Sequence, residues 1–256
     1  MQWDPNQYAR YSDERSRPFF DLTAPIGATT PGRVVDLCWG DGALTATLVH
    51  RWPAASITGL DSSPEMITRA GAQATAALDF VHSGAQDFDA TGTDVLISNA
   101  LLQWVPEHRE LLVQWADQLN VDGWLAFQVP DNFAAPSHQL MRTVAESPRW
   151  RSQLAGLLRH TDAVARPAEY LSLLIGCGLE VDVWQTTYLH LLTGENPVLD
   201  WVRGTGLRPV LAVLSPDEQA EFEAEYASRL RRAYPEQPYG TVFPFLRTFA
   251  VAHKPA

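Results

Sequence analysis

Between residues 33 and 130, short runs of apolar, often β-branched residues alternate with segments whose apolar residues recur every three or four positions. The runs predict strands, and the three-to-four-residue spacing predicts helices. We expect strands over 33–37, 56–60, 80–82, 93–99 and 124–129, and helices over 43–51, 62–77 and 108–119. This alternation is typical of βαβ units and therefore predicts a doubly wound, mostly parallel sheet in an α/β fold.

Two helix starts carry a capping signal. In the run Asp61-Ser62-Ser63-Pro64-Glu65, Ser62 and Glu65 have the spacing of a capping box, and Pro64 suits a first helical turn. Ser215 and Glu218 repeat that spacing ahead of a charged segment. The second box predicts a long helix over 215–234.

The regular alternation ends near Pro130. Beyond it we expect a helix over 167–175, a strand over 180–188, a short helix and turn over 196–207, and a last strand over 245–252. The predicted core comprises residues 31–130, 167–188 and 241–256. Residues 131–166 and 189–240 are predicted to form an inserted helical cap, and residues 1–30 a lid segment.

Composition narrows the possible partners. The chain has 256 residues, of which 46% are hydrophobic and 19% charged, as is typical of a soluble globular protein. The formal net charge is −11, and the basic residues form no cluster. These features argue against nucleic acid or an anionic membrane as a partner. An anionic small-molecule substrate remains compatible, because a few local arginines can bind it. Neither a protein partner nor an oligomer is indicated.

Cysteine use and hydropathy suggest a compartment. Cys38 and Cys177 form no CxxC motif, so we expect neither a disulfide framework nor a metal site. The chain contains no apolar stretch near the ~20 residues of a membrane helix, and its first residues lack the shape of a signal peptide. We therefore expect a cytoplasmic protein.

The stretch over residues 34–42, Val-Val-Asp-Leu-Cys-Trp-Gly-Asp-Gly, leads from a predicted strand through a tight glycine turn into a helix. This order is typical of a loop that binds a nucleotide-type cofactor. Asp61 ends the next strand, where a carboxylate suits the hydroxyls of a ribose. Asp36 and Asp41 would repel a pyrophosphate. They favour a cofactor with a cationic end, such as S-adenosylmethionine, which carries a sulfonium and an ammonium group.

Further short motifs lie both inside and outside this region. They are Trp3-Asp4-Pro5 with Tyr8, Glu14-Arg15-Ser16-Arg17-Pro18, Arg51-Trp52-Pro53, Leu60-Asp61-Ser62-Ser63-Pro64-Glu65-Met66, Ser98-Asn99-Ala100, Gln103-Trp104-Val105-Pro106 with His108, Pro130-Asp131-Asn132-Phe133, Pro136-Ser137-His138, Val181-Asp182-Val183-Trp184, Thr186-Thr187-Tyr188 with His190, Asp200-Trp201-Val202, and Gly206-Leu207-Arg208-Pro209. On these motifs the chain resembles class I S-adenosylmethionine-dependent methyltransferases, which are Rossmann-like, and within them the trans-aconitate 2-methyltransferases.

The resemblance implies S-adenosylmethionine as cofactor and assigns residues to its parts. The turn would line the methionine part, the second strand's end would hold the ribose and adenosine, and the fourth strand's end would face the reacting group. The residues concerned are, in that order, Asp36, Cys38, Gly40 and Gly42; Asp61, Ser62 and Met66; and Asn99 and Trp104.

The chain departs from the pattern of the family in two places, the loop after the first strand and the end of the third strand. The family's loop reads Asp-Leu-Gly-Cys-Gly-Pro-Gly, whereas this chain has Cys38 in place of the first glycine and Trp39 after it. After the third strand the family places an acidic residue against the adenine amino group, and Gly84 stands there. Asp87 is close enough in sequence to substitute. These departures predict weaker or altered cofactor binding.

The resemblance also implies an acceptor with several carboxylates, methylated on one carboxylate oxygen to give a monomethyl ester. Cationic and neutral donors in the matching motifs would bind it: Arg15, Arg17, Asn132, His138, Tyr188, His190 and Arg208. A carboxylate is already ionised at pH 7 and needs no general base. The transfer would therefore depend on proximity and alignment, and we nominate no catalytic acid, base or nucleophile.

The divergent loop leaves another function open. A member that keeps the fold and cap could catalyse a different biosynthetic step, such as an elimination or cyclisation, with altered or lost S-adenosylmethionine binding. A non-catalytic binding subunit is a third possibility. Binding of S-adenosylmethionine separates these hypotheses.

Overall fold

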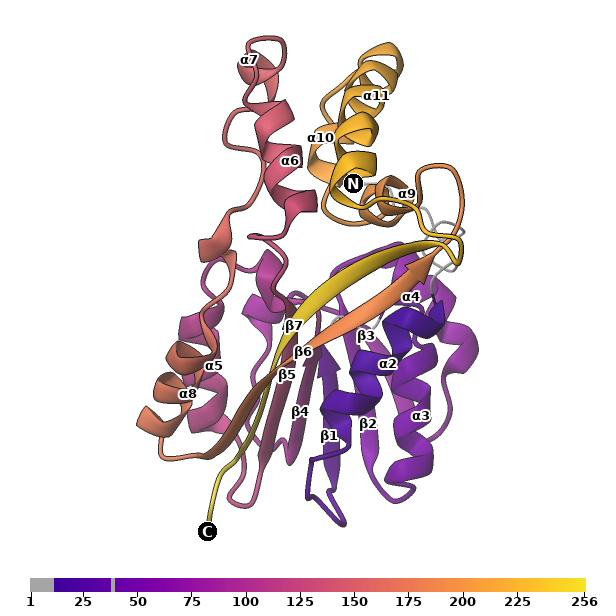
Figure 1. The fold of residues 1–256 in the computed structure, drawn as a ribbon. Helices are drawn as coiled ribbons and strands as arrows, with labels where there is room; N and C mark the ends of the chain where they lie inside the picture. The colour runs from indigo at the N-terminus through magenta and orange to yellow at the C-terminus, as the bar shows by residue number, and fades with distance from the viewer. Residues whose placement is uncertain (1–11, 38–39) are drawn as a thin grey trace. The chain divides into compact units, whose positions relative to one another are not determined.

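The computed structural model describes residues 12–37 and 40–256, with side chains from Ser16 onward. Within these residues, seven strands form one sheet in the order β3-β2-β1-β4-β5-β7-β6 (Figure 1). They are β1 (Arg33–Leu37), β2 (Ser56–Asp61), β3 (Leu78–His82), β4 (Val95–Asn99), β5 (Trp124–Pro130), β6 (Glu180–Leu192) and β7 (Thr241–His253). The pairs β1–β2, β1–β4, β2–β3 and β4–β5 are parallel. The predicted α/β class with a mostly parallel sheet is therefore confirmed.

The helices follow the predicted order. They are α2 (Ser12–Thr23), α3 (Ala43–Arg51), α4 (Pro64–Ala70), α5 (His108–Gln118), α6 (Pro136–Ala145), α7 (Arg151–Leu154), α8 (Pro167–Gly176), α9 (Pro197–Arg203), α10 (Arg208–Leu211) and α11 (Pro216–Ala233). The described residues also form short 3₁₀ helices, which are η1 (Gly71–Gln73), η2 (Ala85–Asp87), η3 (Leu102–Trp104) and η4 (Thr161–Ala163). Among the described helices, none has both the length and the apolarity needed to cross a bilayer.

The described chain divides into two compact units. The sheet unit comprises Arg15–Pro130, Val164–Thr186 and Thr248–Ala256. The helical unit comprises, among the described residues, 12–14, Asp131–Ala163 and Thr187–Arg247. Both β6 and β7 continue from one unit into the other.

Each unit has its own core. In the sheet unit, β1 and β4 are buried along almost their whole length, as expected of central parallel strands covered on both faces. In the helical unit, large aromatic side chains are fully buried, among them Trp150, Trp201 and Phe222. The rings of Trp150 and Phe222 meet edge to face, with their centroids 5.6 Å apart.

The predicted capping box at α4 is wrong by one residue. The cap is Ser63, whose Oγ accepts a hydrogen bond from the Met66 backbone N–H and donates to Glu65 Oε2. Pro64 causes the difference, because the residue before a proline is held in an extended conformation, which is also the conformation of an N-cap. The helix then ends at Ala70 rather than near Ala77, with η1 after it. The box of Ser215 and Glu218 at α11 is confirmed.

The Arg51-Trp52-Pro53 motif has a structural role. The Arg51 guanidinium donates to the carbonyl oxygens of Thr23 and Ile26, both at 2.6 Å. The Trp52 indole N–H donates to the Ala28 carbonyl oxygen at 2.9 Å. These bonds fix the segment after α2 against the end of α3.

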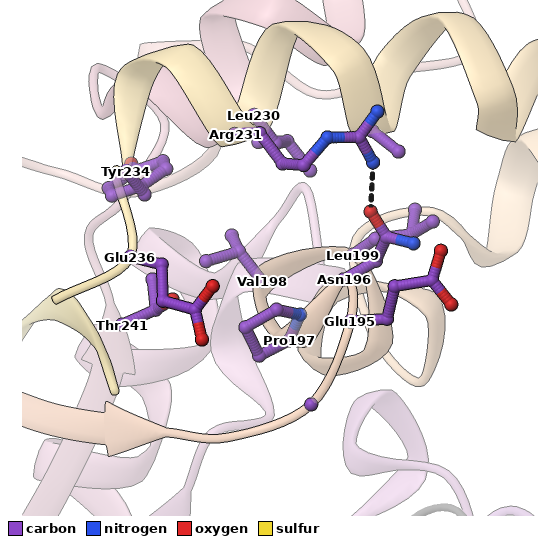
Figure 2. A pocket seen from close by; sticks show the side chains of 12 residues that line it. Glu195, Asn196, Pro197, Val198, Leu199, Leu230, Arg231, Tyr234, Glu236 and Thr241 are labelled. Carbon is purple, nitrogen blue, oxygen red and sulfur yellow. Dashed lines mark hydrogen bonds between the residues drawn. The ribbon is translucent and has the colours of Figure 1, made fainter. Parts of the chain in front are cut away.

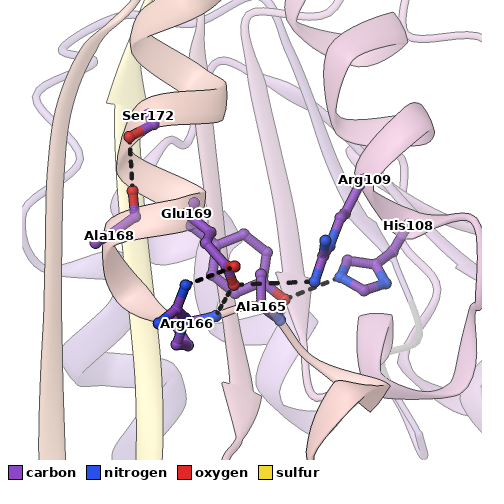
Figure 3. Close-up of polar contacts among 8 residues, drawn as sticks. His108, Arg109, Ala165, Arg166, Ala168, Glu169 and Ser172 are labelled. Atoms are coloured by element: carbon purple, nitrogen blue, oxygen red, sulfur yellow. Dashed lines mark hydrogen bonds and ion pairs between the residues drawn. The ribbon is translucent and has the colours of Figure 1, made fainter.

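A buried hydrogen-bond chain joins α5 to α8, which lie side by side (Figures 1 and 3). His108 Nδ1 lies 2.9 Å from the Val105 carbonyl oxygen, which can only accept, so Nδ1 donates. In the neutral ring Nε2 then accepts from the Tyr170 hydroxyl at 3.0 Å, and that hydroxyl accepts from the Ala165 N–H. Burial lowers the pKa of His108 and keeps the ring neutral.

Candidate active site

Three predicted cofactor residues meet where parallel strands end. Asp36 lies near the end of β1, and Asp61 and Asn99 are the last residues of β2 and β4. Because β1 pairs in parallel with both neighbours, the carboxyl ends of these strands lie at one edge of the sheet. In such sheets, ligands bind at this edge.

Asp36 is a buried acid, and one of its carboxyl oxygens accepts no hydrogen bond from the described residues. Its side chain is 1% exposed, and the Thr45 hydroxyl donates to Oδ2 at 2.6 Å. No hydrogen-bond donor among residues 12–37 and 40–256 reaches Oδ1. Burial raises the pKa of Asp36 to about 7, with Thr45 opposing and the Asp61 carboxyl adding to the rise. A cation placed at Oδ1 would offset the cost of burying the ionised form.

Asp61 is held by the turn that follows it. Its Oδ1 accepts the Ser63 backbone N–H at 2.9 Å. Burial raises its pKa, and this rise is opposed by backbone N–H groups of Ser63, Gly40 and Ser62 and by His82. Asp61 therefore links the end of β2 to the glycine turn after β1.

The two glycines of the turn serve different purposes. Gly40 and Gly42 have φ angles of 70° and 82°, in the left-handed region that favours glycine. A Cβ at Gly42 would lie 2.9 Å from the Phe80 ring, whereas a Cβ at Gly40 would meet no atom of the described residues within 4 Å. Gly42 is therefore needed for packing, and Gly40 leaves open space beside the backbone. Cys38 and Trp39 lie outside the described residues.

Gly84, which follows β3, lies next to the acidic side chain of Asp87. A Cβ added to Gly84 would lie 3.2 Å from Asp87 Oδ2 and 3.3 Å from Gln86 Oε1. The Asp87 carboxylate thus occupies the space that a side chain at position 84 would enter. This geometry is compatible with Asp87 as the substitute for the missing acid, which stays a prediction.

The end of β4 contains an unusual backbone conformation. Ala100 has a φ of 60°, a left-handed conformation that costs an L-residue about 1–2 kcal/mol. Asn99 Oδ1 accepts from Gln128 Nε2, and Gln103 Nε2 donates to the Ala100 carbonyl oxygen, both at 2.6 Å. Strained backbone clusters at functional sites. Sequence reasoning included Asn99 but missed its partner Gln128.

The remaining cofactor candidates lie close to these strand ends. Met66 is buried in α4, in the turn that Ser63 caps. Trp104 is 43% exposed in η3. Ser62 contributes its carbonyl oxygen, which lies 3.0 Å from His82 Nε2.

The predicted acceptor residues are divided between the two units. Arg17 belongs to the sheet unit, is largely exposed on α2, and forms an ion pair with Asp21 at 3.6 Å. The side chain of Arg15 lies outside the described part of the chain. Asn132, His138, Tyr188, His190 and Arg208 belong to the helical unit.

Within the helical unit these residues differ in their surroundings. The Asn132 side-chain amide bonds both the carbonyl oxygen and the N–H of Leu246, at 2.8 and 2.9 Å. Tyr188 and His190 lie on one face of β6, and the His190 ring stacks on Trp201 at 4.5 Å. Burial lowers the pKa of Arg208. Asn132 therefore fixes backbone, and its role toward an acceptor stays a prediction.

Two hollows lie among the described residues of the helical unit. One, of about 450 Å³, is lined by the segment that enters α9 and by the end of α11, and it contains no predicted site residue (Figure 2). The other, of about 270 Å³, contains His138 together with Arg142 and Arg159. Sequence reasoning missed both arginines. Arg142 follows His138 by four residues on one helix face, a signal that was available.

Comparison with known proteins identifies the family. A family model described as a methyltransferase domain matches residues 34–123. A trans-aconitate 2-methyltransferase of Streptomyces avermitilis is 54% identical, over 99% of this chain and 97% of that protein. The chain belongs to the trans-aconitate 2-methyltransferase family. Relatives of the same name in Streptomyces coelicolor and Mycobacterium tuberculosis are 52% and 45% identical, covering 99% and 98% of this chain and 87% and 96% of theirs.

Solved structures agree on the fold of this methyltransferase family. A plantazolicin methyltransferase in complex with SAH superposes with a TM-score of 0.53 at 17% identity, covering 99% of this chain and 92% of that one. Phosphoethanolamine N-methyltransferase 2 of Haemonchus contortus, in complex with S-adenosyl-L-methionine, gives 0.54 at 13%, covering 94% and 53%. The predicted class I, Rossmann-like fold is confirmed.

The sheet edge fits the cofactor of a methyltransferase family. Asp36 Oδ1 is a buried acceptor without a donor among the described residues, which suits a cationic group. Gly40 leaves space for close approach to the backbone, and Asp61 stands at the end of β2, where a carboxylate suits the hydroxyls of a ribose. All three features lie within the sheet unit.

Proposed function

We propose that the protein transfers a methyl group from S-adenosylmethionine to one carboxylate of trans-aconitate, or of a closely similar polycarboxylic acid, giving a monomethyl ester. The observation that carries this proposal is 54% identity over 99% of the chain to a relative that bears the name of the activity. The donor set at the sheet edge supports the same cofactor.

Bound S-adenosylmethionine would supply an electrophilic methyl group on a sulfonium. Asp36 would hold the cationic end of this cofactor, and Asp61 its ribose hydroxyls. Gly40 admits the cofactor to the turn, while Gly42 keeps the turn packed against Phe80. Asn99 and Trp104 would line the reacting end. These roles remain predictions from the family pattern.

The acceptor carboxylate needs no activation by the protein. It is ionised at pH 7, so no proton must be removed before its oxygen attacks the methyl carbon. The protein contributes by binding and aligning the two reactants and by excluding water. We also propose a cytoplasmic location, since the two cysteines form no disulfide framework.

The test is to mix the purified chain with S-adenosylmethionine and trans-aconitate and to follow both products by mass spectrometry. We expect S-adenosylhomocysteine and a monomethyl ester in equal amounts. Calorimetric titration with S-adenosylmethionine should show micromolar binding. The absence of detectable binding at millimolar ligand would refute the proposal. Conversion of an acid without consumption of S-adenosylmethionine would instead favour the elimination or cyclisation hypothesis, which no comparison supports.

A further inference from the structure

The smaller hollow of the helical unit is formed by three segments that are distant in sequence. The segment from Phe133 into α6 contributes His138 and Arg142, the segment after α7 contributes Arg159, and the turn between α9 and α10 contributes Gly206. The hollow is narrow and opens to solvent, so it admits a single carboxylate group rather than a whole organic acid.

Arg142 fixes the walls of this hollow. Its Nη2 donates to the Phe133 carbonyl oxygen at 2.6 Å, and its Nη1 donates to the Arg159 carbonyl oxygen at 3.3 Å. The guanidinium therefore joins the loop before α6 to the segment that carries Arg159. It also places a positive charge beside the hollow.

Arg159 brings a second guanidinium to the same place. It is half-buried, and its charged carbon lies 5.6 Å from the centre of the Phe133 ring. Burial lowers its pKa to about 10, so it remains charged at neutral pH. A partly desolvated guanidinium gains more from an anion than an exposed one does, and its forked donors match a carboxylate.

The pKa of His138 reflects both its burial and the positive charges beside the hollow. Burial, followed by the charges of Arg142 and Arg159, lowers its pKa to about 4. The ring is therefore neutral at pH 7 and keeps one N–H donor. Its Nδ1 lies 3.2 Å from Ser137 Oγ, and when that hydroxyl donates to Nδ1 the N–H is on Nε2. Its Nε2 faces Gly206, where a Cβ would lie at only 3.3 Å. The glycine thus keeps open the space beside a neutral donor.

We propose that this hollow is the carboxylate-binding pocket for the acceptor, with Arg159 as the contacting cation, His138 as a neutral donor, and Arg142 as the residue that positions them. The proposal rests on the proposed function for the identity of the acceptor. The larger hollow fits a polycarboxylate less well, because the carboxylates of Glu195 and Glu236 line it (Figure 2).

Two variants from opposite walls test the pocket. Arg159→Gln removes the cation, and Gly206→Ala adds a methyl group beside His138 Nε2. We expect Arg159→Gln to raise KM for trans-aconitate about tenfold or more and Gly206→Ala to raise it severalfold. The Kd for S-adenosylmethionine should change less than about twofold in both. Arg151→Gln, an exposed arginine on α7, is the matched control and should retain the wild-type KM.

The outcomes separate the pocket from the proposed function. If the wild type methylates trans-aconitate and Arg159→Gln keeps its KM, the pocket proposal is wrong and the function stands. If the wild type forms no ester, calorimetric titration with trans-aconitate and citrate tests the pocket alone. Binding that Arg159→Gln abolishes would support it. Equal binding by both proteins, or none by the wild type, would overturn it. Circular dichroism establishes that each variant is folded.

Discussion

At the carboxyl end of the sheet, burial determines the protonation state of a single acidic side chain, Asp36. The Asp36 carboxyl is only partly ionised at pH 7, because burial and the neighbouring Asp61 raise its pKa to about 7. A cation bound at Oδ1 would favour the ionised form. Cofactor binding and loss of the Asp36 proton should therefore be linked.

We predict that S-adenosylmethionine binding releases up to about half a proton at pH 7, and that the Kd rises as the pH falls below 7, by at most about tenfold per pH unit. Calorimetry in two buffers of different ionisation enthalpy measures the release. Thr45→Val removes the donor to Oδ2 and should increase the release at pH 7. Asp36→Asn should weaken binding and remove the release. Binding without proton exchange in the wild type would contradict the role of Asp36.

The place of each site residue in the chain explains whether it could be predicted from the sequence. Asp36, Asp61 and Asn99 stand at strand ends, and strand ends can be located from apolar runs. Arg159 lies in an irregular segment, and its neighbours in the hollow come from distant parts of the chain. Local patterns do not encode such proximity, so this arginine could be found only from the structure.

Among the elements, the α5–α8 contact depends on a chain of three hydrogen bonds through His108 and Tyr170. The apolar spacing predicted both helices, but not this polar link between them. The link works only while the His108 ring is neutral, because a protonated Nε2 cannot accept from the Tyr170 hydroxyl.

Tyr170→Phe should lower the free energy of unfolding by about 1–3 kcal/mol, since it leaves buried polar groups of His108 and Ala165 without their partner. The pKa of His108 is lower in the folded chain than in the unfolded chain, so the unfolded state binds more protons below about pH 6.5. The link therefore stabilises the folded chain above about pH 6.5. This contribution is lost as the pH falls from there toward the lower pKa that His108 has in the folded chain.

Urea denaturation at pH 7.5 and pH 5.5 measures both effects. The loss caused by Tyr170→Phe should be smaller at pH 5.5, where the wild type has already lost part of the contribution. Ser172→Ala, which removes an exposed hydroxyl from α8, is the control and should change stability little at either pH. An equal loss at both pH values would contradict the neutral His108 acceptor.

At the scale of the whole molecule, the two units should respond differently to ligands. We predict that S-adenosylhomocysteine slows amide hydrogen exchange in sheet-unit peptides covering residues 40–42 and 62–66. Peptides from α11 should exchange within about twofold of their free rate. Ligand at 100 times its Kd should also raise the free energy of unfolding by about 2.7 kcal/mol, if it binds the folded state alone. Protection confined to the helical unit would contradict the assigned site.

The fold could be predicted from the sequence more accurately than the ends of its strands and helices. Buried strands such as β1 and β4 are nearly continuous apolar runs, which predicted their place in a parallel sheet. The strands β6 and β7 extend beyond the predicted limits. In β6, Leu189 and Leu191 are exposed while His190 is buried, so the hydrophobic alternation that marks a strand is inverted there.

The strand order also has a consequence for synthesis on the ribosome. In the described sheet β7 lies between β5 and β6, although β6 precedes it in the chain. A nascent chain that has not yet reached Thr241 therefore exposes the edge of β5 and carries a β6 with no strand to pair with. Completion of the sheet must wait for β7, so premature termination before it would leave two unpaired strand edges, a recognised route to aggregation.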